Sequence, residues 1–153
     1  MPENTNPSGS CTKDGRKIAL ITGGAGGIGR ELAKLFARDA YDIILVDRNL
    51  KNLQDVKKIL SDAFPELCIM LIEQDLALPD AADFVHGFTR DQGLHISVLI
   101  NCAGFGTYGF IDDIDQDREV DMLQLHVMTL YRMTRFYLKD MIGRDEGQII
   151  NFS

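Results

Sequence analysis

Residues 22–29 read TGGAGGIG, and this stretch decides the fold. A short apolar run, residues 18–22, leads into it, and apolar residues recur at helical spacing over residues 28–36. A buried strand, a glycine-rich turn and an amphipathic helix thus follow one another, which is the order required of a dinucleotide-binding loop. In such a loop the glycines let the backbone approach a pyrophosphate, and the helix N-terminus supplies free N–H donors and a favourable dipole.

The glycines are so dense that they fit three spacings at once. Gly24, Gly26 and Gly29 fit G-x-G-x-x-G, whereas Gly23 joins Gly26 and Gly29 in T-G-x-x-G-x-x-G. With Gly27 in place of Gly26, the same stretch fits T-G-x-x-x-G-x-G. The spacing alone therefore leaves the type of dinucleotide-binding protein open. A purely structural turn is the alternative, but it needs one or two glycines rather than five in seven positions.

Strand and helix patterns alternate along the rest of the chain. Buried strands are expected at 18–22, 42–47, 67–73, 96–101 and 147–153. Amphipathic helices are expected at 27–39, from Leu50 to just before Pro65, at 79–92 and at 116–142. Crossovers of this length between buried strands imply a parallel sheet with helices on both faces. Right-handed crossovers then predict an α/β fold: a doubly wound, Rossmann-like sheet in three α/β/α layers, truncated after its fifth strand.

Three segments of this pattern carry separate expectations. Residues 1–17 are polar and predict a flexible tail, so residues 18–153 would form one NAD(P)-binding Rossmann domain, incomplete at its C-terminus. The acidic segment 112–121 is typical of a helix start, because carboxylates are favourable near the positive end of the macrodipole. The apolar residues of 116–142 do not keep to one stripe, so more than one face of this helix needs cover. We expect one face on the sheet and another against a second chain in a homo-oligomer.

Composition excludes several classes of protein. The 153 residues are 45% hydrophobic and 25% charged with a net charge of −7, which is typical of a soluble globular domain. No Lys/Arg cluster marks a nucleic-acid-binding face, and no apolar run is long enough to span a membrane. The three cysteines are widely spaced and odd in number, which fits neither a disulfide framework nor a zinc site. They favour reduced thiols in a cytoplasmic protein, and no metal is expected.

Residues at the end of the second expected strand bear on whether the cofactor is NAD or NADP. Asp47 stands there, and an acid at this point can accept hydrogen bonds from both ribose hydroxyls of NAD while repelling a 2′-phosphate. Arg48 follows at once and could bind such a phosphate, which makes it a further candidate; the alternative is a solvated loop residue. Because the glycine loop holds no basic residue, the pattern favours NAD and leaves NADP open.

Two further motifs make the pattern specific. The dipeptide DL at residues 75–76 follows the third expected strand, and NCAG at residues 101–104 follows the fourth. With the glycine loop and Asp47, they make the chain resemble the classical short-chain dehydrogenases/reductases over residues 17–153. The family motif after the fourth strand is N-N-A-G, in which Cys102 replaces the second Asn. This motif distinguishes the classical type from the extended, epimerase-like type and from methyltransferases with a glycine-rich loop.

The resemblance implies a role for each matching residue. The residues implied in cofactor binding are Gly23, Gly27, Ile28 and Gly29 along the pyrophosphate, Asp47 at the adenosine ribose, Asp75 and Leu76 beside the adenine, and Asn101, Ala103 and Gly104 along the cofactor. Asn101 would also tie down the central strands. Taken alone, Asp75 would be interpreted as a loop cap and Asn101 as a turn residue.

In the family, the helix between the fourth and fifth strands carries an Asn that helps to hold a water in a proton relay. Leu125-His126-Val127 is the matching stretch, so His126 stands where the Asn is expected. A His could make similar hydrogen bonds and also change charge near neutral pH. The alternative is an ordinary helix His with no role. His126 is the one catalytic candidate in this sequence.

Family chemistry transfers a hydride between a nicotinamide and a carbonyl or alcohol carbon, with a Ser, a Tyr and a Lys four residues after the Tyr. None of the four tyrosines has a Lys at that distance, and Ser153 matches only the first serine of the family's G-x-I-I-N-x-S-S. The expectation is therefore the cofactor-binding portion of an NAD(P)-dependent oxidoreductase, inactive by itself, which meets a small-molecule substrate only in a complete chain. The alternative is a non-catalytic nucleotide-binding or interaction module.

Overall fold

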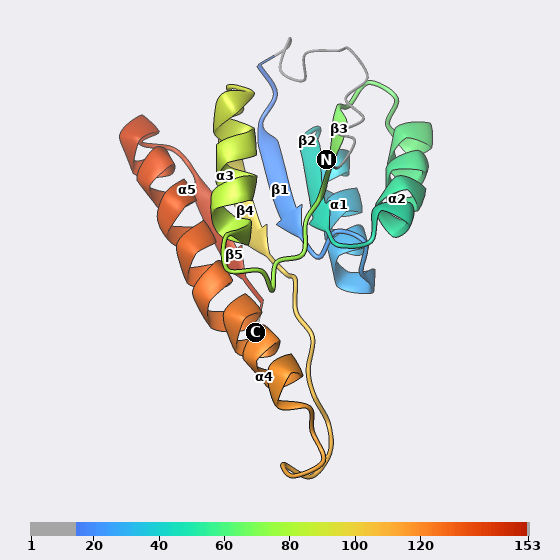
Figure 1. The fold of residues 1–153 in the computed structure, drawn as a ribbon. Helices are drawn as coiled ribbons and strands as arrows, with labels where there is room; N and C mark the ends of the chain where they lie inside the picture. Colours follow the sequence, from blue (N-terminus) through green and yellow to red (C-terminus); the bar gives the residue numbers. More distant parts are fainter. Residues whose placement is uncertain (1–14, 153) are drawn as a thin grey trace.

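The computed structural model describes residues 15–152, which form a parallel sheet with helices on both of its faces (Figure 1). The strands, in chain order, are β1 (Ile18–Thr22), β2 (Asp42–Asp47), β3 (Ile69–Glu73), β4 (Ile96–Asn101) and β5 (Gln148–Asn151). The helices are α1 (Gly27–Arg38), α2 (Leu50–Ala63), α3 (Ala81–Asp91), α4 (Gln116–Leu123) and α5 (Leu130–Arg144). A π-helical segment, η1 (Gln124–Thr129), joins α4 directly to α5. Most of the expected tail, residues 1–14, and Ser153 lie outside the described residues.

The order of the strands decides where a ligand can bind. The sheet order is β3-β2-β1-β4-β5, and every neighbouring pair is parallel. The chain steps outward from β1 to β3 and then returns to the other side of β1 with β4 and β5. The direction thus reverses between β1 and β4, and in open α/β sheets ligands bind beside such a switch point, at the carboxyl ends of the strands. This topology confirms the predicted doubly wound, Rossmann-like fold.

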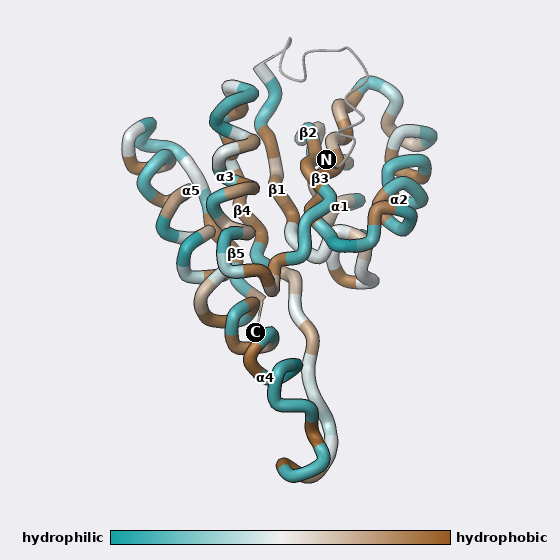
Figure 2. Tube along the Cα trace, viewed as in Figure 1, coloured by the Kyte–Doolittle hydropathy of each residue, from teal (hydrophilic) through white to brown (hydrophobic). Residues whose placement is uncertain are grey.

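Two apolar layers hold the helices against the sheet, because alternate residues of a strand point to opposite faces. In β1, Ile18 and Leu20 belong to the layer beneath α3 and α5, whereas Ala19 and Ile21 belong to the layer beneath α1 and α2. Figure 2 shows the strands as an apolar centre, with hydrophilic residues spread over the helices. Burial on both faces explains why the central strand β1 is an almost continuous apolar run in the sequence.

The long helix expected at 116–142 differs most from the prediction. It begins where expected: the Asp115 carboxylate caps it by accepting the N–H of Asp117 at 3.0 Å, and further acidic residues lie in its first turn. The helical stretch continues to Arg144 but changes to π-helical geometry over Gln124–Thr129. The expectation of one uninterrupted α-helix was wrong at this point, because apolar spacing does not reveal a single wide turn.

The cysteines correct one expectation drawn from composition. Cys68 takes part in a disulfide bond, so the expectation of reduced thiols is wrong for this residue. Cys102 carries a free thiol. Over residues 15–152, no helix is long and apolar enough to cross a membrane, and no group of three or more His, Cys, Asp or Glu is placed to hold a metal ion.

Candidate functional site

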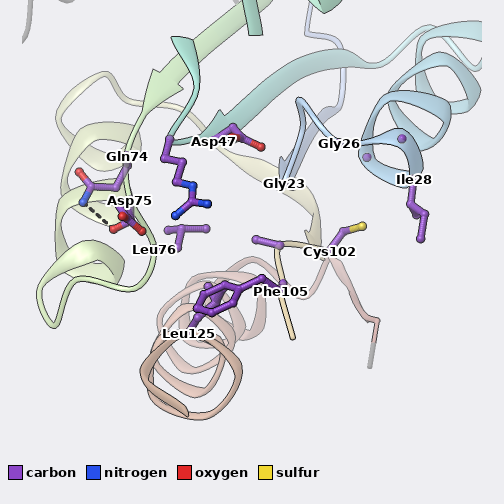
Figure 3. Close-up of a pocket in the computed structure, with 15 residues that line it drawn as sticks. Gly23, Gly26, Ile28, Asp47, Gln74, Asp75, Leu76, Cys102, Phe105 and Leu125 are labelled. Atoms are coloured by element: carbon purple, nitrogen blue, oxygen red, sulfur yellow. Dashed lines mark hydrogen bonds between the residues drawn. The ribbon is translucent and has the colours of Figure 1, made fainter. Parts of the chain in front are cut away.

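A pocket of about 290 Å³ opens at the carboxyl ends of β1 to β4, beside the switch point of the sheet (Figure 3). Every cofactor-binding candidate except Asn101 lines it, namely Gly23, Gly27, Ile28, Gly29, Asp47, Arg48, Asp75, Leu76, Ala103 and Gly104. The lining also includes Gly26, Gln74, Cys102, Phe105 and Leu125. Residues that the sequence placed in separate motifs therefore surround one space.

The glycine loop forms one wall of the pocket. Gly23 has a φ of +67°, and a Cβ there would lie 2.9 Å from the Cα of Ala103, so the fold itself requires glycine. A Cβ on Gly27, by contrast, would meet nothing within 4 Å. Because Gly27 lines the pocket, its missing side chain keeps the backbone open to a ligand.

The N-terminus of α1 lies at the same wall. The helix begins at Gly27, and its N-cap, Gly26, has no side chain with which to bond the first N–H groups. The first turn holds no acidic residue. Uncapped N–H groups and the positive end of the helix dipole make such a terminus a binding site for phosphate or another anion.

Asp47 links the end of β2 to the glycine loop. Its Oδ2 accepts the N–H of Ala25 at 3.3 Å, and its Oδ1 accepts the N–H of Asn49 at 3.1 Å. These bonds hold the carboxylate at the pocket and leave lone pairs for a ligand hydroxyl. Arg48 lines the same pocket, so an acidic and a basic group share one space. The bond from Ala25 joins the glycine loop to the end of β2 and has no signal in the sequence.

The loop after β3 supplies a second wall. Oδ1 of Asp75 accepts the N–H of Ala77 at 3.0 Å, which is the loop cap that Asp75 taken alone suggests. Leu76 is 6% exposed and lies with Phe105 and Leu125 on an apolar side of the pocket (Figure 3). Sequence reasoning missed Phe105 and Leu125, because both look like ordinary core residues.

Hydrogen bonds join the glycine loop to the loop after β4. Oγ1 of Thr22 accepts the N–H groups of Cys102 and Ala103, both at 3.0 Å. Nδ2 of Asn101 donates to Oδ1 of Asn151 at 2.8 Å, which ties β4 to β5. Sequence reasoning also missed Thr22, although it directly precedes the glycines. Asn101 supports this end of the sheet without lining the pocket itself.

Burial raises the pKa of two side chains, one in the pocket and one between α3 and α5. Burial raises the pKa of the Cys102 thiol, so this pocket-lining group stays protonated at neutral pH. Burial also raises the pKa of Tyr137, whose hydroxyl lies 2.8 Å from Oγ1 of Thr89 between α3 and α5. Neither group is poised as a nucleophile or a base.

His126 contacts the loop after β4 from η1. Its Nε2 lies 2.8 Å from the carbonyl oxygen of Phe105, and Nε2 donates because a carbonyl can only accept. A Cβ on Gly104 would lie 2.6 Å from Cε1 of His126, so the ring rests directly on that glycine. His126 therefore contacts the loop after β4 directly. Its part in a proton relay stays a prediction.

The outward side of α4, η1 and α5 exposes large apolar side chains beside charged ones such as Arg135 and Lys139. The exposed apolar side chains are Val120, Leu123, Val127, Met128, Tyr131, Leu138 and Ile142. The opposite side of the same stretch is buried, through Leu125, Met133, Tyr137 and Met141. These two apolar sides agree with the pattern expected for residues 116–142.

Comparison with known proteins gives consistent matches. A family model described as short chain dehydrogenase matches residues 17–153. The uncharacterized oxidoreductase YmfI of Bacillus subtilis is 31% identical over 138 residues, which cover 90% of this chain and 55% of the relative. The very-long-chain 3-oxoacyl-CoA reductase of Rattus norvegicus is 30% identical over 140 residues, covering 88% of this chain and 44% of the relative. The chain thus spans about half the length of the curated relatives it matches.

Solved structures give the same result. L-sorbose reductase from Gluconobacter frateurii, complexed with NADPH and L-sorbose, has a TM-score of 0.80 and 29% identity, covering 89% of this chain and 51% of that one. A short-chain dehydrogenase from Sphingobium yanoikuyae, in complex with NADPH, has a TM-score of 0.81 and 27% identity, covering 88% of this chain and 52% of that one.

Proposed function

The chain belongs to the short-chain dehydrogenase family, and on that premise we propose that residues 18–153 are the cofactor-binding portion of an NAD(P)-dependent oxidoreductase. The nicotinamide cofactor would supply or accept the hydride exchanged with a carbonyl or alcohol carbon. One observation carries the proposal: an uncapped helix N-terminus and an acid at the end of β2 meet in one pocket at the switch point. That combination suits a dinucleotide, which carries an anionic pyrophosphate and a ribose.

The glycine loop would hold the pyrophosphate. Gly23, Gly27, Ile28 and Gly29 line the pocket at the start of α1, where backbone N–H groups can donate to phosphate oxygens. The open space at Gly27 supports this assignment, because a side chain there is unnecessary for packing and would obstruct the approach of a ligand.

Asp47 and Arg48 would set the choice between NAD and NADP. The Asp47 carboxylate can accept hydrogen bonds from ribose hydroxyls and disfavours a 2′-phosphate by its charge, so NAD is the cofactor we propose first. Arg48 lines the same pocket and would attract that phosphate. NADP is therefore the alternative, and the NADPH complexes of two similar proteins favour it.

The remaining pocket residues would contact the rest of the cofactor. Asp75 and Leu76 would flank the adenine, and Ala103 and Gly104 would lie along the cofactor from the loop after β4. Asn101 would act from behind the pocket by fixing β4 against β5. The relatives act on substrates as different as L-sorbose and 3-oxoacyl-CoA, so we assign only a small-molecule carbonyl or alcohol in a complete chain.

The apolar side of α4, η1 and α5 supports a homo-oligomer through residues 116–142. Large apolar side chains such as Val127 (54% exposed) and Ile142 (70% exposed) would gain cover from a second copy. A cytoplasmic location stays a prediction.

A non-catalytic nucleotide-binding module is the second candidate for this stretch taken alone. No tyrosine among the 153 residues has a Lys four positions later, so binding without turnover is expected of these residues.

Isothermal titration calorimetry of this chain with NADH and NADPH tests the proposal. Saturable binding at one site supports it. Absence of heat and of any stabilisation of the chain at millimolar cofactor would overturn it.

A further inference from the structure

The π-helical segment η1 contacts both loops that frame the apolar side of the pocket. Nε2 of His126 donates to the Phe105 carbonyl oxygen at 2.8 Å, and Oγ1 of Thr129 donates to the Leu76 carbonyl oxygen, also at 2.8 Å. Leu125, from the same segment, lines the pocket with Leu76 and Phe105. One helical turn therefore holds the loop after β3 and the loop after β4 together.

The bond from Thr129 is buried. The residue is 2% exposed, so its hydroxyl must find its partners within the protein. It donates to Leu76 and accepts from Nε2 of Gln124 at 3.3 Å, which satisfies the hydroxyl in both directions. Removing the hydroxyl would leave the Leu76 carbonyl without this donor, so the bond fixes where the backbone at Leu76 lies.

The wide turn explains how one segment reaches two loops. In an α-helix, residues three positions apart share a face. A π-turn closes from residue i to i+5, so side chains three positions apart diverge around the axis. His126 and Thr129 stand three positions apart, and each meets the carbonyl of a different loop. Gln124 and Thr129, five positions apart, are brought into contact instead.

We propose that His126 and Thr129 are positioning residues that hold the Leu76 and Phe105 loops at the separation the cofactor needs. The proposal rests on the proposed function, because it assigns this apolar wall to the dinucleotide. His126 acts here as a fixed hydrogen-bond donor to the loop backbone. Thr129 sets the opposite loop, and Leu125 fills the space between them.

Thr129→Val and Thr129→Ser form a matched pair for this test. Valine keeps the branched shape and removes the hydroxyl, whereas serine keeps the hydroxyl. We expect Thr129→Val to weaken cofactor affinity in calorimetry by about five- to tenfold, the worth of one buried hydrogen bond. Thr129→Ser should stay within about twofold of wild type. Equal affinity of the valine variant and wild type, or equal loss in both variants, would overturn the role of the hydroxyl.

His126→Ala and His126→Gln test the second contact. His126 is exposed at the surface of η1, so these variants should fold even where Thr129→Val does not. Glutamine keeps a side-chain N–H donor and should recover affinity that alanine loses, about three- to fivefold. His95→Ala is the control, since His95 precedes β4 at the end of the strand away from the pocket. A glutamine variant as weak as the alanine variant would contradict the donor role.

NMR gives a readout that general loosening of the fold would not reproduce. The imidazole nitrogens of His126 should show the tautomer protonated at Nε2, and the Leu76 carbonyl carbon should shift in Thr129→Val but not in Thr129→Ser. A tautomer protonated at Nδ1, or an unmoved Leu76 carbonyl, would overturn the proposal even where affinity falls. A wild-type chain that binds no dinucleotide would overturn the proposed function instead, and with it the positioning role.

Discussion

The substitution Gly27→Val is expected to block ligand binding while leaving the fold intact. A Cβ at Gly27 meets no atom within 4 Å, and Gly27 is the first residue of α1. The added Cβ therefore displaces no packed atom of the exposed Gly27 site, and the difference in helix propensity between glycine and valine is about 0.5 kcal/mol or less. Within the pocket, the isopropyl group would fill the space at the helix N-terminus that the pyrophosphate needs.

The loss of affinity follows from the interactions that the side chain would block. A hydrogen bond to a charged group contributes about 1.5–3 kcal/mol, and an anion at a partly buried helix N-terminus gains up to about 2 kcal/mol. Blocking one or two such contacts removes roughly 2–4 kcal/mol of binding free energy, which corresponds to a Kd about 30- to 1,000-fold higher.

Calorimetry with NADH and NADPH, together with thermal melts, measures both effects. Gly87→Val is the matched control, because it also adds a side chain into open space but lies on α3 away from the pocket. Both variants should melt close to wild type, and only Gly27→Val should lose binding. A folded Gly27→Val chain with wild-type affinity would refute the assignment of the glycine loop. Gly23→Ala should behave oppositely and lower stability by at least about 1–2 kcal/mol, since φ there is +67° and the new Cβ would also press on the backbone of Ala103.

The other predictions address the remaining parts of the proposal. Asp47→Ala should change the ratio of the Kd values for NAD and NADP several-fold, in the direction that reduces any preference for NAD. An unchanged ratio would indicate that Arg48, not Asp47, determines the choice of cofactor. Asn101→Ala should lower the free energy of unfolding in urea by about 1–3 kcal/mol, because the buried Asn101 amide gives up its hydrogen bonds to Thr134 and to Asn151 on β5; an unchanged midpoint would argue against the strand-tying role. Val127→Glu should shift the chain toward the monomer in light scattering, and a wild-type chain that is already monomeric would refute the proposed interface. These 153 residues by themselves should not oxidise or reduce any carbonyl or alcohol with NAD(H) or NADP(H), and measured turnover would overturn the assignment of this stretch as a cofactor-binding portion without the catalytic residues.

The elements that could be predicted from the sequence are those whose physics is local. β2 and β4 have the predicted bounds, 42–47 and 96–101, because each is built around an apolar run, residues 43–46 in β2 and residues 98–100 in β4, that is buried between the helix layers. The glycine loop was recognisable because its backbone demands, such as the positive φ of Gly23, exclude other residues. Parallel strands bring their carboxyl ends to one edge, so the separate motifs converge on one pocket.

What could not be predicted depends on contacts between distant segments. The π-turn at Gln124–Thr129 leaves the apolar spacing almost unchanged, and its contacts run to loops far away in the sequence. Phe105 and Leu125 differ from core residues only in facing a pocket, which requires knowing what lies opposite them. The disulfide at Cys68 likewise depends on spatial proximity, which cysteine spacing does not report.

The most direct test is to titrate the ¹⁵N-labelled chain with NADH and NADPH and follow the backbone amides. Dinucleotide binding at the proposed site should shift the amides of residues 23–29, 47–49, 74–77 and 102–106, while amides of α2 and the far end of α3 stay in place. No shifts at millimolar cofactor, or shifts confined to another part of the chain, would contradict a dinucleotide site on the glycine loop.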